Sequence, residues 1–373
     1  MKKILIFHPA LAPYRKDFFN ALGNAYDLNV VFLLRNNKNQ GFRQDLLLKD
    51  ATYAYEYLDH TFTLFNHRVN WGYLSKIRQT KPEIIITSEF GFSTIIVYLY
   101  KKILRKKYKI FTICDDSEDM IINMEGIRRR LRRFFAKRLS GIICVNPKVA
   151  HTYKSWGNKC ACVFPIIRNE EQYYQGLDEI RNLSKEYITN WKLANKINIL
   201  FVGRIAKVKN ISGLLKVFSK LPEKIKNIAN IIIVGDGSEK QDIILEANRL
   251  NIHNNIVLPG KYEGNHLLAW YNVGSFFILP SIFEPFGAVT GEALLSGCPT
   301  LISNKAGSSW LIDSTNGRLF NPLSETDFIS NLTIMIENSK PTPTDGYFRS
   351  NLLSQNFSNY LSNLINNLND DEK

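Results

Sequence analysis

The stretch SIFEPFGAVTGEALLSGCPT, residues 281–300, contains two carboxylates whose spacing could serve chemistry. Glu284 lies in a loop after a predicted strand, and Glu292 lies eight positions later, inside a predicted helix. A carboxylate accepts hydrogen bonds from hydroxyl groups, whereas it repels a bare phosphate. Structural roles are open as well, since Glu284 could be a solvated loop acid and Glu292 could complement the helix dipole. The pair fits a ligand that offers neutral hydroxyls.

Two basic residues follow the first predicted strand of the same half. Arg204 and Lys209 lie in GRIAKVKN, residues 203–210, where a loop opens a helix. Cations beside the free N–H groups of a helix N-terminus make a site for an anion. In a basic chain the same residues could also be solvated surface charges, so the spacing alone leaves both interpretations open.

Glycines accompany these charges. Gly203 precedes Arg204, and Gly235 lies in VGDGSEK after the next strand. Gly287 stands where the helix with the second glutamate begins. Glycine lets the backbone approach a ligand closely, although a lone GxG is also an ordinary strand–helix turn. Cations and helix ends for a diphosphate, with carboxylates for hydroxyls beside it, favour a nucleotide sugar.

The elements that must hold these residues form a repeated strand–helix rhythm. In the first half, strands are predicted at Lys3–His8, Leu28–Leu33, Glu83–Thr87, Lys109–Ile113 and Gly141–Val145. In the second half, strands are predicted at Ile197–Val202, Asn230–Val234, Ile256–Leu258, Ser275–Leu279 and Thr300–Ser303, with helices at about 210–220, 238–250, 264–272, 288–297 and 325–337. The pattern is typical of doubly wound α/β domains, which bind ligands at the carboxyl ends of their parallel strands.

The chain is long enough for two such domains. We expect a first domain at 1–167, a second at 195–349 and a terminal segment at 350–373, with a cleft between the domains. Residues 168–194 are polar and helical, and we expect them to be an interdomain linker.

Composition limits the partners. The 48 Lys and Arg residues against 34 Asp and Glu give a net charge of +14, which favours an anionic partner. No nucleic-acid module is recognisable, so nucleic acid is disfavoured. The apolar run Ile4–Phe7 is too short for a secretory signal and no run could span a bilayer, so we expect a cytoplasmic protein. The five cysteines are expected to be reduced thiols.

The second half resembles the retaining glycosyltransferases of the GT-B fold, in the group four family (glycosyl transferases group 1). The resemblance covers roughly 200–322 and rests on motifs in family order: GRxxxxK at 203–209, VGDG at 234–237, LPG at 258–260, LPSIFEPFGAVTGEAL at 279–294, AG at 306–307 and NG at 316–317. Each motif alone is weak, whereas EPFG with its second glutamate in this order is specific. The implied fold is GT-B, with two Rossmann-like domains and a C-terminal helix at 350–373 that crosses back to the first domain.

The resemblance implies roles for the second half. Arg204 and Lys209 would bind the donor diphosphate, Glu284 would contact sugar hydroxyls, and Glu292 would hold the ribose. The remaining donor-binding residues would be Gly203, Gly235, Lys261, Tyr262, Phe286, Gly287 and Ala288. Catalysis would rest on Glu284, Arg204, Lys209 and, from the first half, Asp115. No cofactor or metal is expected, because cations and a helix end would neutralise the leaving diphosphate.

The loop after the first strand, HPALAPYRKDFF at 8–19, resembles that of a subgroup which carries PYR in place of a glycine-rich loop. Pro13, Tyr14 and Arg15 would then face the acceptor. Tyr14 and Arg15 could also serve as helix-start packing and surface charge.

Acidic residues follow two further strands of the first half. Asp115 and Asp116 lie where many relatives carry a His before an Asp, and Cys114 stands in the place of that histidine. The departure puts any inherited catalytic histidine in doubt, and the two acids could contact the acceptor or cap the next helix. The run could suggest a metal, but no supporting His or DxD pair occurs elsewhere. Glu89 is expected to contact the acceptor, from its position after EIIIT alone.

A basic region spans residues 98–138, with YLYKKILRKKYK at 98–109 and IRRRLRRFFAKR at 127–138. Apolar residues at helical spacing predict a helix packed on the sheet, with its charges solvated. The added hypothesis is that this basic face meets anionic lipid headgroups.

The sequence therefore predicts a metal-independent retaining glycosyltransferase that uses a nucleotide-diphosphate sugar, with UDP favoured over GDP. Its acceptor would be a glycan or a lipid-linked glycan in polysaccharide or lipopolysaccharide synthesis, at the inner face of the membrane. A sugar phosphorylase or epimerase of the same fold, or a catalytically silent glycan-binding protein, remain alternatives. A nicotinamide-dependent oxidoreductase is disfavoured because no GxGxxG follows the first strand.

Overall fold

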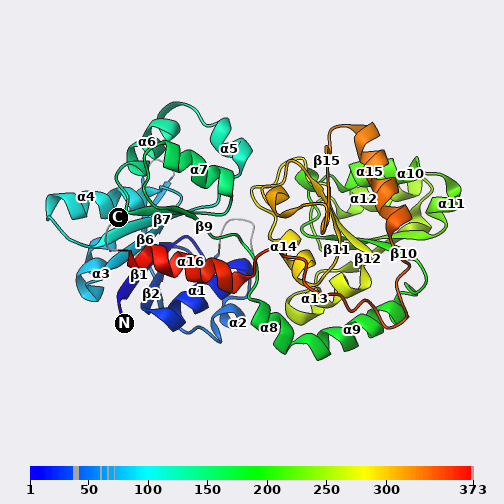
Figure 1. Cartoon of the computed structure of the whole chain (residues 1–373), viewed down its shortest axis with the longest axis horizontal. Helices are drawn as coiled ribbons and strands as arrows, with labels where there is room; N and C mark the ends of the chain where they lie inside the picture. The colour runs from blue at the N-terminus through cyan, green and yellow to red at the C-terminus, as the bar shows by residue number, and fades with distance from the viewer. Residues whose placement is uncertain (37–41, 59–60, 65–66, 71, 371–373) are drawn as a thin grey trace. The chain divides into compact units, whose positions relative to one another are not determined.

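The predicted strands form two separate parallel sheets, each in its own unit of the chain (Figure 1). The computed structural model describes residues 1–36, 42–58, 61–64, 67–70 and 72–370. Unit 1 comprises Met1–Ile166 and Ser358–Lys373, and unit 2 comprises Ile167–Phe357. This arrangement of two Rossmann-like α/β sheets confirms the predicted fold class.

Unit 1 has a seven-stranded parallel sheet in the order β3-β2-β1-β6-β7-β8-β9. Its strands are β1 (Lys3–His8), β2 (Asp27–Phe32), β3 (Ala54–Tyr57), β6 (Ile84–Ser88), β7 (Lys109–Cys114), β8 (Gly141–Cys144) and β9 (Ala161–Val163). A separate antiparallel pair consists of β4 (Thr61–Leu64) and β5 (His67–Asn70). The helices are α1 (Pro13–Ala25), α2 (Gln44–Leu48), α3 (Tyr73–Thr80), α4 (Phe92–Ile103), α5 (Glu118–Ile122), α6 (Gly126–Ala136), α7 (Pro147–Ser155) and the C-terminal α16 (Phe357–Asn369).

Unit 2 has a six-stranded parallel sheet in the order β12-β11-β10-β13-β14-β15. Its strands are β10 (Ile197–Val202), β11 (Ala229–Val234), β12 (Ile256–Gly260), β13 (Phe276–Leu279), β14 (Thr300–Ser303) and β15 (Gly317–Phe320). The helices are α8 (Glu170–Gln175), α9 (Leu177–Asn190), α10 (Ile211–Ser219), α11 (Glu223–Lys226), α12 (Lys240–Arg249), α13 (Gly264–Val273), α14 (Ala288–Leu295) and α15 (Glu325–Asn338), with 3-10 turns η1 (Lys207–Lys209), η2 (His253–Asn255) and η3 (Ser309–Leu311).

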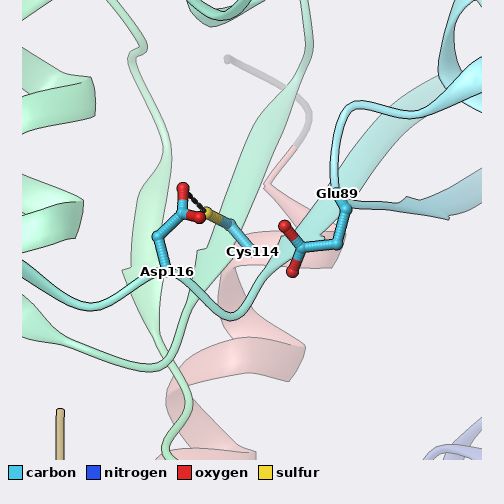
Figure 2. Close-up of side chains that lie close together, drawn as sticks. All are labelled: Glu89, Cys114 and Asp116. Atoms are coloured by element: carbon cyan, nitrogen blue, oxygen red, sulfur yellow. Dashed lines mark hydrogen bonds between the residues drawn. The ribbon is translucent and has the colours of Figure 1, made fainter. Parts of the chain in front are cut away.

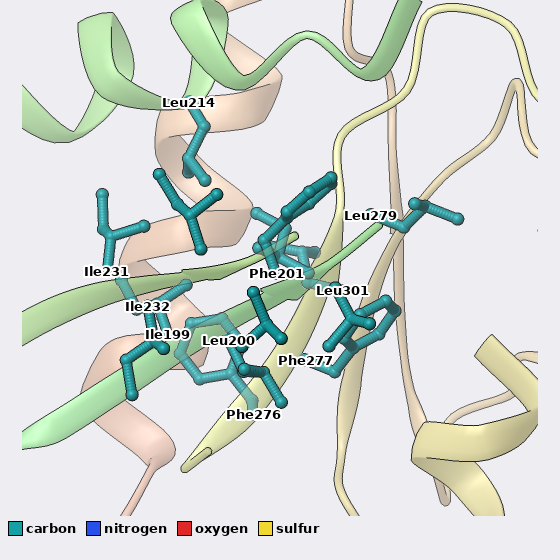
Figure 3. Close-up of a cluster of buried hydrophobic side chains, with 14 of the residues drawn as sticks. Ile199, Leu200, Phe201, Leu214, Ile231, Ile232, Phe276, Phe277, Leu279 and Leu301 are labelled. Atoms are coloured by element: carbon teal, nitrogen blue, oxygen red, sulfur yellow. The ribbon is translucent and has the colours of Figure 1, made fainter. Parts of the chain in front are cut away.

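The central strands of unit 2 are apolar on both faces, as a parallel sheet between two helical layers requires. Every residue of β10, INILFV, is buried, and so is every residue of β13. Their side chains interleave with those of β11, α10 and β14, including Leu214 and Leu301 (Figure 3). This packed sheet is the rigid support for the loops that leave its carboxyl edge.

Residues 168–194, which we expected to link the domains, form α8 and α9 of unit 2. Helix α9 packs against α13, where the Tyr187 ring stacks on Trp270 with centroids 4.6 Å apart. The Ser184 hydroxyl donates to the Ala269 carbonyl at 3.0 Å. Apolar residues at helical spacing on α9 make these contacts, so the segment adds to the core of unit 2.

Helix α16 belongs to unit 1, although the chain reaches it only after completing unit 2. Leu364 and Leu368 are fully buried, and the Lys109 Nζ donates to the carbonyls of Leu368 and Asp370 at 3.2 and 2.8 Å. Within the described ranges, no helix combines the length and apolar composition needed to cross a bilayer.

Candidate active site

The switch point of unit 2 lies between β10 and β13. These two strands are neighbours in the sheet, but the chain leaves β10 toward β11 on one side and β13 toward β14 on the other. Loops that diverge from adjacent strand ends leave a crevice, and open α/β sheets bind ligands there. The predicted donor residues Arg204, Lys209 and Glu284 all lie on these two loops.

Lys209 and Glu284 form an ion pair across the switch point. The two loops are tied together beside the pair, because the Ile282 N–H donates to the Val208 carbonyl at 2.9 Å. The side chains of the pair are only 14% and 13% exposed, so their charges act at lower dielectric than surface charges do. A cation and a carboxylate thus lie together where a ligand could contact both.

A third loop holds Glu284 and its neighbours from the other side. The Gly307 N–H donates to the Glu284 carbonyl at 2.9 Å, and the Ser308 N–H donates to the Phe286 carbonyl at 2.7 Å. A Cβ atom at Gly307 would lie 1.9 Å from the Pro285 carbonyl oxygen, so only glycine fits here. The loop after β14 therefore fixes the EPFG loop, which accounts for the glycine of the AG motif.

The N-terminus of α14 offers free backbone donors. Gly287 precedes the helix with φ of +95°, a left-handed conformation that favours glycine. Thr290 N–H donates to the Gly287 carbonyl, whereas no described residue accepts a hydrogen bond from the N–H groups of Gly287, Ala288 or Val289. Free N–H groups and the helix dipole make this end of α14 attractive to an anion.

Glu292 lies on α14 and is 8% exposed. Its Oε1 accepts a hydrogen bond from Arg168 Nε at 2.8 Å, and its Oε2 accepts one from the Tyr271 hydroxyl at 3.0 Å. Burial, together with the neighbouring Glu292 charge, raises the pKa of Tyr271 well above its ordinary value, so the phenol stays a donor. Glu292 is thus held in place as an acceptor, and because a carboxylate has about four lone-pair sites, about two remain for a ligand.

Arg204 follows β10 and remains exposed, without an ion pair to any described residue. The turn before it is built on glycines: Gly203 has φ of +151° and Gly235 has φ of +152°. A Cβ atom at Gly235 would lie 1.9 Å from the Gly203 carbonyl oxygen. The two strand ends approach each other because neither residue has a side chain, and Arg204 is left free to meet an anion.

Lys261 and Tyr262 lie after β12, at the margin of the same edge. Lys261 is exposed and pairs with Glu263 at 2.6 Å. The Tyr262 ring packs on Tyr187 and Trp270 with centroids 5.4 and 5.7 Å apart. Tyr262 therefore has a packing role within unit 2, and its remaining surface is partly exposed.

In unit 1, the PYR residues begin α1, with Pro13 at its first position. Tyr14 is 37% exposed, whereas Arg15 is 1% exposed and forms an ion pair with Asp115. His8 lies beside them at the end of β1, where burial and then the Arg15 charge lower its pKa to about 4. His8 is consequently neutral, and its Nδ1 lies 3.0 Å from the Ala10 carbonyl oxygen.

A second arginine, Arg132 on α6, is buried among acceptors. It forms an ion pair with Asp116, which is fully buried, and donates to the Tyr153 hydroxyl at 2.9 Å. The Cys114 thiol donates to the same Asp116 oxygen at 3.2 Å, as Figure 2 shows. Asp116, which the sequence analysis expected to contact the acceptor, is instead closed to solvent and supports the loop after β7.

Glu89 stays half open at this edge. Its Oε1 accepts a hydrogen bond from the Asp115 N–H at 2.7 Å, and its Oε2 lies 3.4 Å from Arg132. Glu89 and Phe90 have φ of +57° and +54°, a left-handed conformation that non-glycine residues rarely adopt. Burial and the neighbouring Asp115 raise the pKa of Glu89.

Glu89 also lines a cavity of about 690 Å³ at the carboxyl edge of unit 1. The other lining residues are mainly apolar: Phe7, Pro9, Leu33, Leu34, Asn36, Tyr73, Ser88, Gly91, Phe92 and Ser93. The cavity offers the Glu89 carboxylate and the hydroxyl-bearing residues Ser88, Ser93 and Tyr73 within mainly apolar walls, which suits a ligand that has both hydroxyl groups and apolar surface.

Glu89, Cys114 and Asp116 place one possible metal-ligand atom each within 4.8 Å of one another. Two observations argue against a metal here. Arg132 already provides a cation to Asp116 and Glu89. Burial raises the pKa of Cys114 well above its ordinary value, whereas a metal ligand must be a thiolate. The cluster fits a hydrogen-bonded network around a guanidinium.

Sequence reasoning missed four residues of these sites: Arg168, Tyr271, Arg132 and Tyr153. Arg168 lies 124 positions from the Glu292 that it contacts, so no local pattern could pair them. Arg132 sits within a run of arginines, where the only signal was its place between the apolar residues of an amphipathic helix.

The chain is similar to known proteins over unit 2 and over its whole length. Residues 185–347 match the model of the family described as Glycosyl transferases group 1. An uncharacterised glycosyltransferase of Methanocaldococcus jannaschii is 24% identical over 295 residues, which are 77% of this chain and 74% of that protein. A Campylobacter jejuni enzyme named as an N-acetylgalactosamine-N,N'-diacetylbacillosaminyl-diphospho-undecaprenol 4-alpha-N-acetylgalactosaminyltransferase is 27% identical over 312 residues, 74% of this chain and 82% of the enzyme.

Among solved structures, HepE of Anabaena in complex with UDP has a TM-score of 0.75 at 15% identity, over 99% of each chain. HepE has also been solved with UDP and glucose and with UDP-glucose. Likeness at this level of identity establishes the fold, which is GT-B. Residues 185–347 of unit 2 are therefore similar to the Glycosyl transferases group 1 family, and the whole chain has the GT-B fold.

Proposed function

We propose that the protein transfers a sugar from a UDP-sugar to a hydroxyl of a glycan or lipid-linked acceptor, with retention of anomeric configuration. The observation that carries the proposal is the switch point of unit 2. There an ion-paired Lys209 and Glu284, an exposed Arg204 and the free N–H groups of α14 follow the carboxyl ends of the neighbouring strands β10 and β13. Glu292 lies on the same helix, one to two turns further along.

Each group suits one part of the donor. Arg204 and the α14 N-terminus would bind the diphosphate, where cations and helix ends stabilise negative charge. Lys209 would stabilise the negative charge that develops on the leaving diphosphate. Its ammonium group is already held in place by Glu284 before the reaction begins. The carboxylates of Glu284 and Glu292 would accept hydrogen bonds from hydroxyls of the sugar and the ribose.

In the reaction, the bond between the anomeric carbon and the diphosphate oxygen breaks. The acceptor oxygen forms a new bond to that carbon on the same face. The acceptor proton passes to the departing phosphate oxygen, so that the nucleoside diphosphate leaves with it. This front-face course is implied by the resemblance to retaining enzymes, and the chain's own part is to hold the diphosphate and the sugar.

Two comparisons support the substrate classes. HepE, which shares the fold, binds UDP and UDP-glucose, which favours uridine as the base. The Campylobacter relative is named for a diphospho-undecaprenol acceptor. We infer an acceptor of this general kind, a hydroxyl on a lipid-linked or growing cell-surface glycan.

In unit 1 the acceptor would meet Glu89, Asp115 and the exposed Tyr14. The half-open carboxylate of Glu89 could accept a hydrogen bond from an acceptor hydroxyl within the apolar-walled cavity. Arg15 is buried against Asp115, so it would fix that carboxylate in place and would leave the acceptor contacts to others.

Thermal unfolding in the presence of UDP, GDP, ADP and TDP tests the donor site. A ligand at a hundred times its dissociation constant should add about 2.7 kcal/mol to the unfolding free energy. We expect UDP to give the largest increase in unfolding free energy. Glu292→Gln should lose this increase, because an amide NH₂ replaces one acceptor oxygen. Glu263→Gln, at an exposed carboxylate after β12, is the matched control and should keep the increase.

If no diphosphate stabilises the wild type, the transferase proposal fails and a catalytically silent glycan-binding protein becomes the better interpretation. If UDP binds but turnover needs inorganic phosphate or no acceptor, the reaction is that of a phosphorylase or an epimerase.

A further inference from the structure

A cationic cavity of about 670 Å³ lies at the opposite edge of the unit 1 sheet, at the amino ends of its strands. The lining residues come from the segments before β1, β6 and β7 and from α3 and α4: Lys2, Ile77, Arg78, Lys81, Pro82, Glu83, Ile84, Tyr100, Lys106, Lys107, Tyr108 and Lys109. None of them belongs to the carboxyl edge where Glu89 and Asp115 lie. The cavity is therefore separate from the site proposed for transfer.

The cavity has six cations and a single carboxylate in its wall. Arg78, Lys81, Lys106 and Lys107 form no ion pair with any residue in the described ranges. The one carboxylate, Glu83, accepts a hydrogen bond from the Lys3 N–H at 3.2 Å. Like charges around one hollow repel each other, so an anion that enters it relieves this repulsion.

Two aromatic side chains shape the cavity. The Arg78 Nε donates to the Tyr100 hydroxyl at 3.2 Å, and its guanidinium lies 5.9 Å from the centroid of that ring. Tyr100 and Tyr108 are 7% and 6% exposed, so they are fixed in the core. Arg78 is thereby held at the wall, and guanidinium groups bind phosphate oxygens in a forked geometry.

Helices α3 and α4 end beside the cavity in an unusual way. Lys81, the C-cap of α3, has φ of +48°, and Arg105, just past α4, has φ of +47°. Helices commonly end with a glycine or asparagine in this left-handed conformation, because a Cβ atom is unfavourable there. Both ends instead carry a cation, which interacts favourably with the negative end of the helix dipole, and of the two Lys81 lines the cavity.

An apolar rim adjoins these charges. Ile103 is 74% exposed and Leu104 is 48% exposed at the end of α4, directly before Arg105, Lys106 and Lys107. Exposed aliphatic side chains next to a run of bases are the composition of segments that lie in a bilayer interface, with the bases at the phosphates.

We propose that this cavity seats the phosphate of an anionic phospholipid headgroup, while Ile103 and Leu104 enter the interface beside it. The inference rests on the proposed function, since an acceptor carried on a lipid requires the enzyme at a membrane. Within the basic region of residues 98–138, the part that faces the membrane would then be the segment at the amino edge of the unit 1 sheet.

Co-sedimentation with vesicles tests the proposal. The protein should bind vesicles of phosphatidylcholine mixed with phosphatidylglycerol, and it should not bind phosphatidylcholine alone. The triple variant Arg78→Gln/Lys81→Gln/Lys107→Gln should lose roughly a hundredfold in vesicle affinity, since each base near an anionic surface strengthens binding several-fold. Ile103→Ser/Leu104→Ser should weaken binding about tenfold without changing its dependence on salt.

The matched control replaces three exposed lysines away from the cavity, in Lys154→Gln/Lys159→Gln/Lys224→Gln, and lowers the net charge equally. Equal losses in both triple variants would mean attraction by net charge alone and would overturn the proposal. Stabilisation of the wild type by inorganic phosphate or glycerophosphate, without vesicle binding, would assign the cavity to a free phosphate and overturn it too. The stabilisation of the triple variant by UDP in thermal unfolding is measured in parallel. A variant that loses vesicle binding and keeps this stabilisation has a defect in the cavity alone, so failure of the cavity proposal is distinguished from failure of the donor site.

Discussion

The carboxyl edges of the two sheets use charge in different ways. At the edge of unit 2, the Lys209–Glu284 ion pair and the exposed Arg204 lie among glycine turns and free helix N–H groups. At the edge of unit 1, Arg15 and Arg132 are buried and paired with Asp115 and Asp116. The edge of unit 2 thus leaves an arginine and backbone donors open, whereas the two arginines at the edge of unit 1 are already used to fix its loops. Substitutions should accordingly reduce activity first in unit 2 and stability first in unit 1.

The largest effect is expected from Arg132→Met in unit 1. It leaves the fully buried Asp116 carboxylate without its cation, and breaking a buried pair in this way costs about 3–5 kcal/mol of unfolding free energy. Denaturant unfolding followed by circular dichroism measures it.

The double variant Arg132→Met/Asp116→Leu removes both charges and should recover much of that loss, because well-packed apolar groups can replace a buried pair. A double variant as unstable as the sum of both single variants would show that the pair is not the unit that holds this loop.

Lys209→Ala should act on turnover. Removing a preorganised charge beside the leaving group reduces kcat by about a hundredfold to a thousandfold, with unfolding changed much less. Lys207→Ala, an exposed lysine on the same 3-10 turn, is the matched control. Steady-state kinetics of sugar transfer from a UDP-sugar measure this loss of kcat. An equal loss of kcat in the two variants would mean that the reaction depends on the 3-10 turn and not on the Lys209 charge.

The neutral His8 makes unit 1 sensitive to acid. Its pKa falls from 6.5 to about 4 on folding, so between these values the unfolded chain binds a proton that the folded chain does not. The contribution of neutral His8 to the free energy of unfolding is therefore fully present above pH 6.5. It is lost as the pH falls to about 4, by at most about 3 kcal/mol.

His8→Asn removes this titration and keeps a donor for the Ala10 carbonyl. Hydrogen exchange over the two units between these pH values should show a flatter pH dependence for unit 1 in the variant and no change for unit 2. Identical profiles for wild type and variant would contradict the lowered pKa.

Lys261→Ala should have the smallest effect. An exposed pair such as Lys261–Glu263 contributes about 0–1 kcal/mol, so the melting temperature should hardly change. If Lys261 borders the base, UDP affinity should fall by only a few-fold. A loss of transfer activity as large as that of Lys209→Ala would mean that the loop after β12 contributes as much to the reaction as the loop after β10.

Periodicity was enough to predict the two sheets. β1, β10 and β14 begin and end at the predicted residues, because each is a short apolar run bounded by polar or turn residues. The edge strands β3, β9 and β15 and the antiparallel pair β4–β5 were missed, and β3 (AYEY) and β15 (GRLF) show why, since polar or exposed residues leave them without a continuous apolar run. The helices at 168–194 were recognised as helical, but their packing on α13 depends on contacts far along the chain.

The site was predictable where chemistry and turn geometry coincide in a local motif. EPFG and its following glutamate lie within one loop and one helix, so their spacing carries information. The contacts of Glu292 with Arg168 and of Asp116 with Arg132 arise only from tertiary packing. Sequence therefore indicated which charges exist, and only the structure indicated which of them are already paired.

Hydrogen–deuterium exchange with and without UDP tests most directly whether the switch point of unit 2 is the donor site. We predict slower exchange at 203–210, 235–238 and 284–292, with little change at 89–90 and 114–116 of unit 1. Slower exchange confined to unit 1, or none in either unit at saturating UDP, would contradict it.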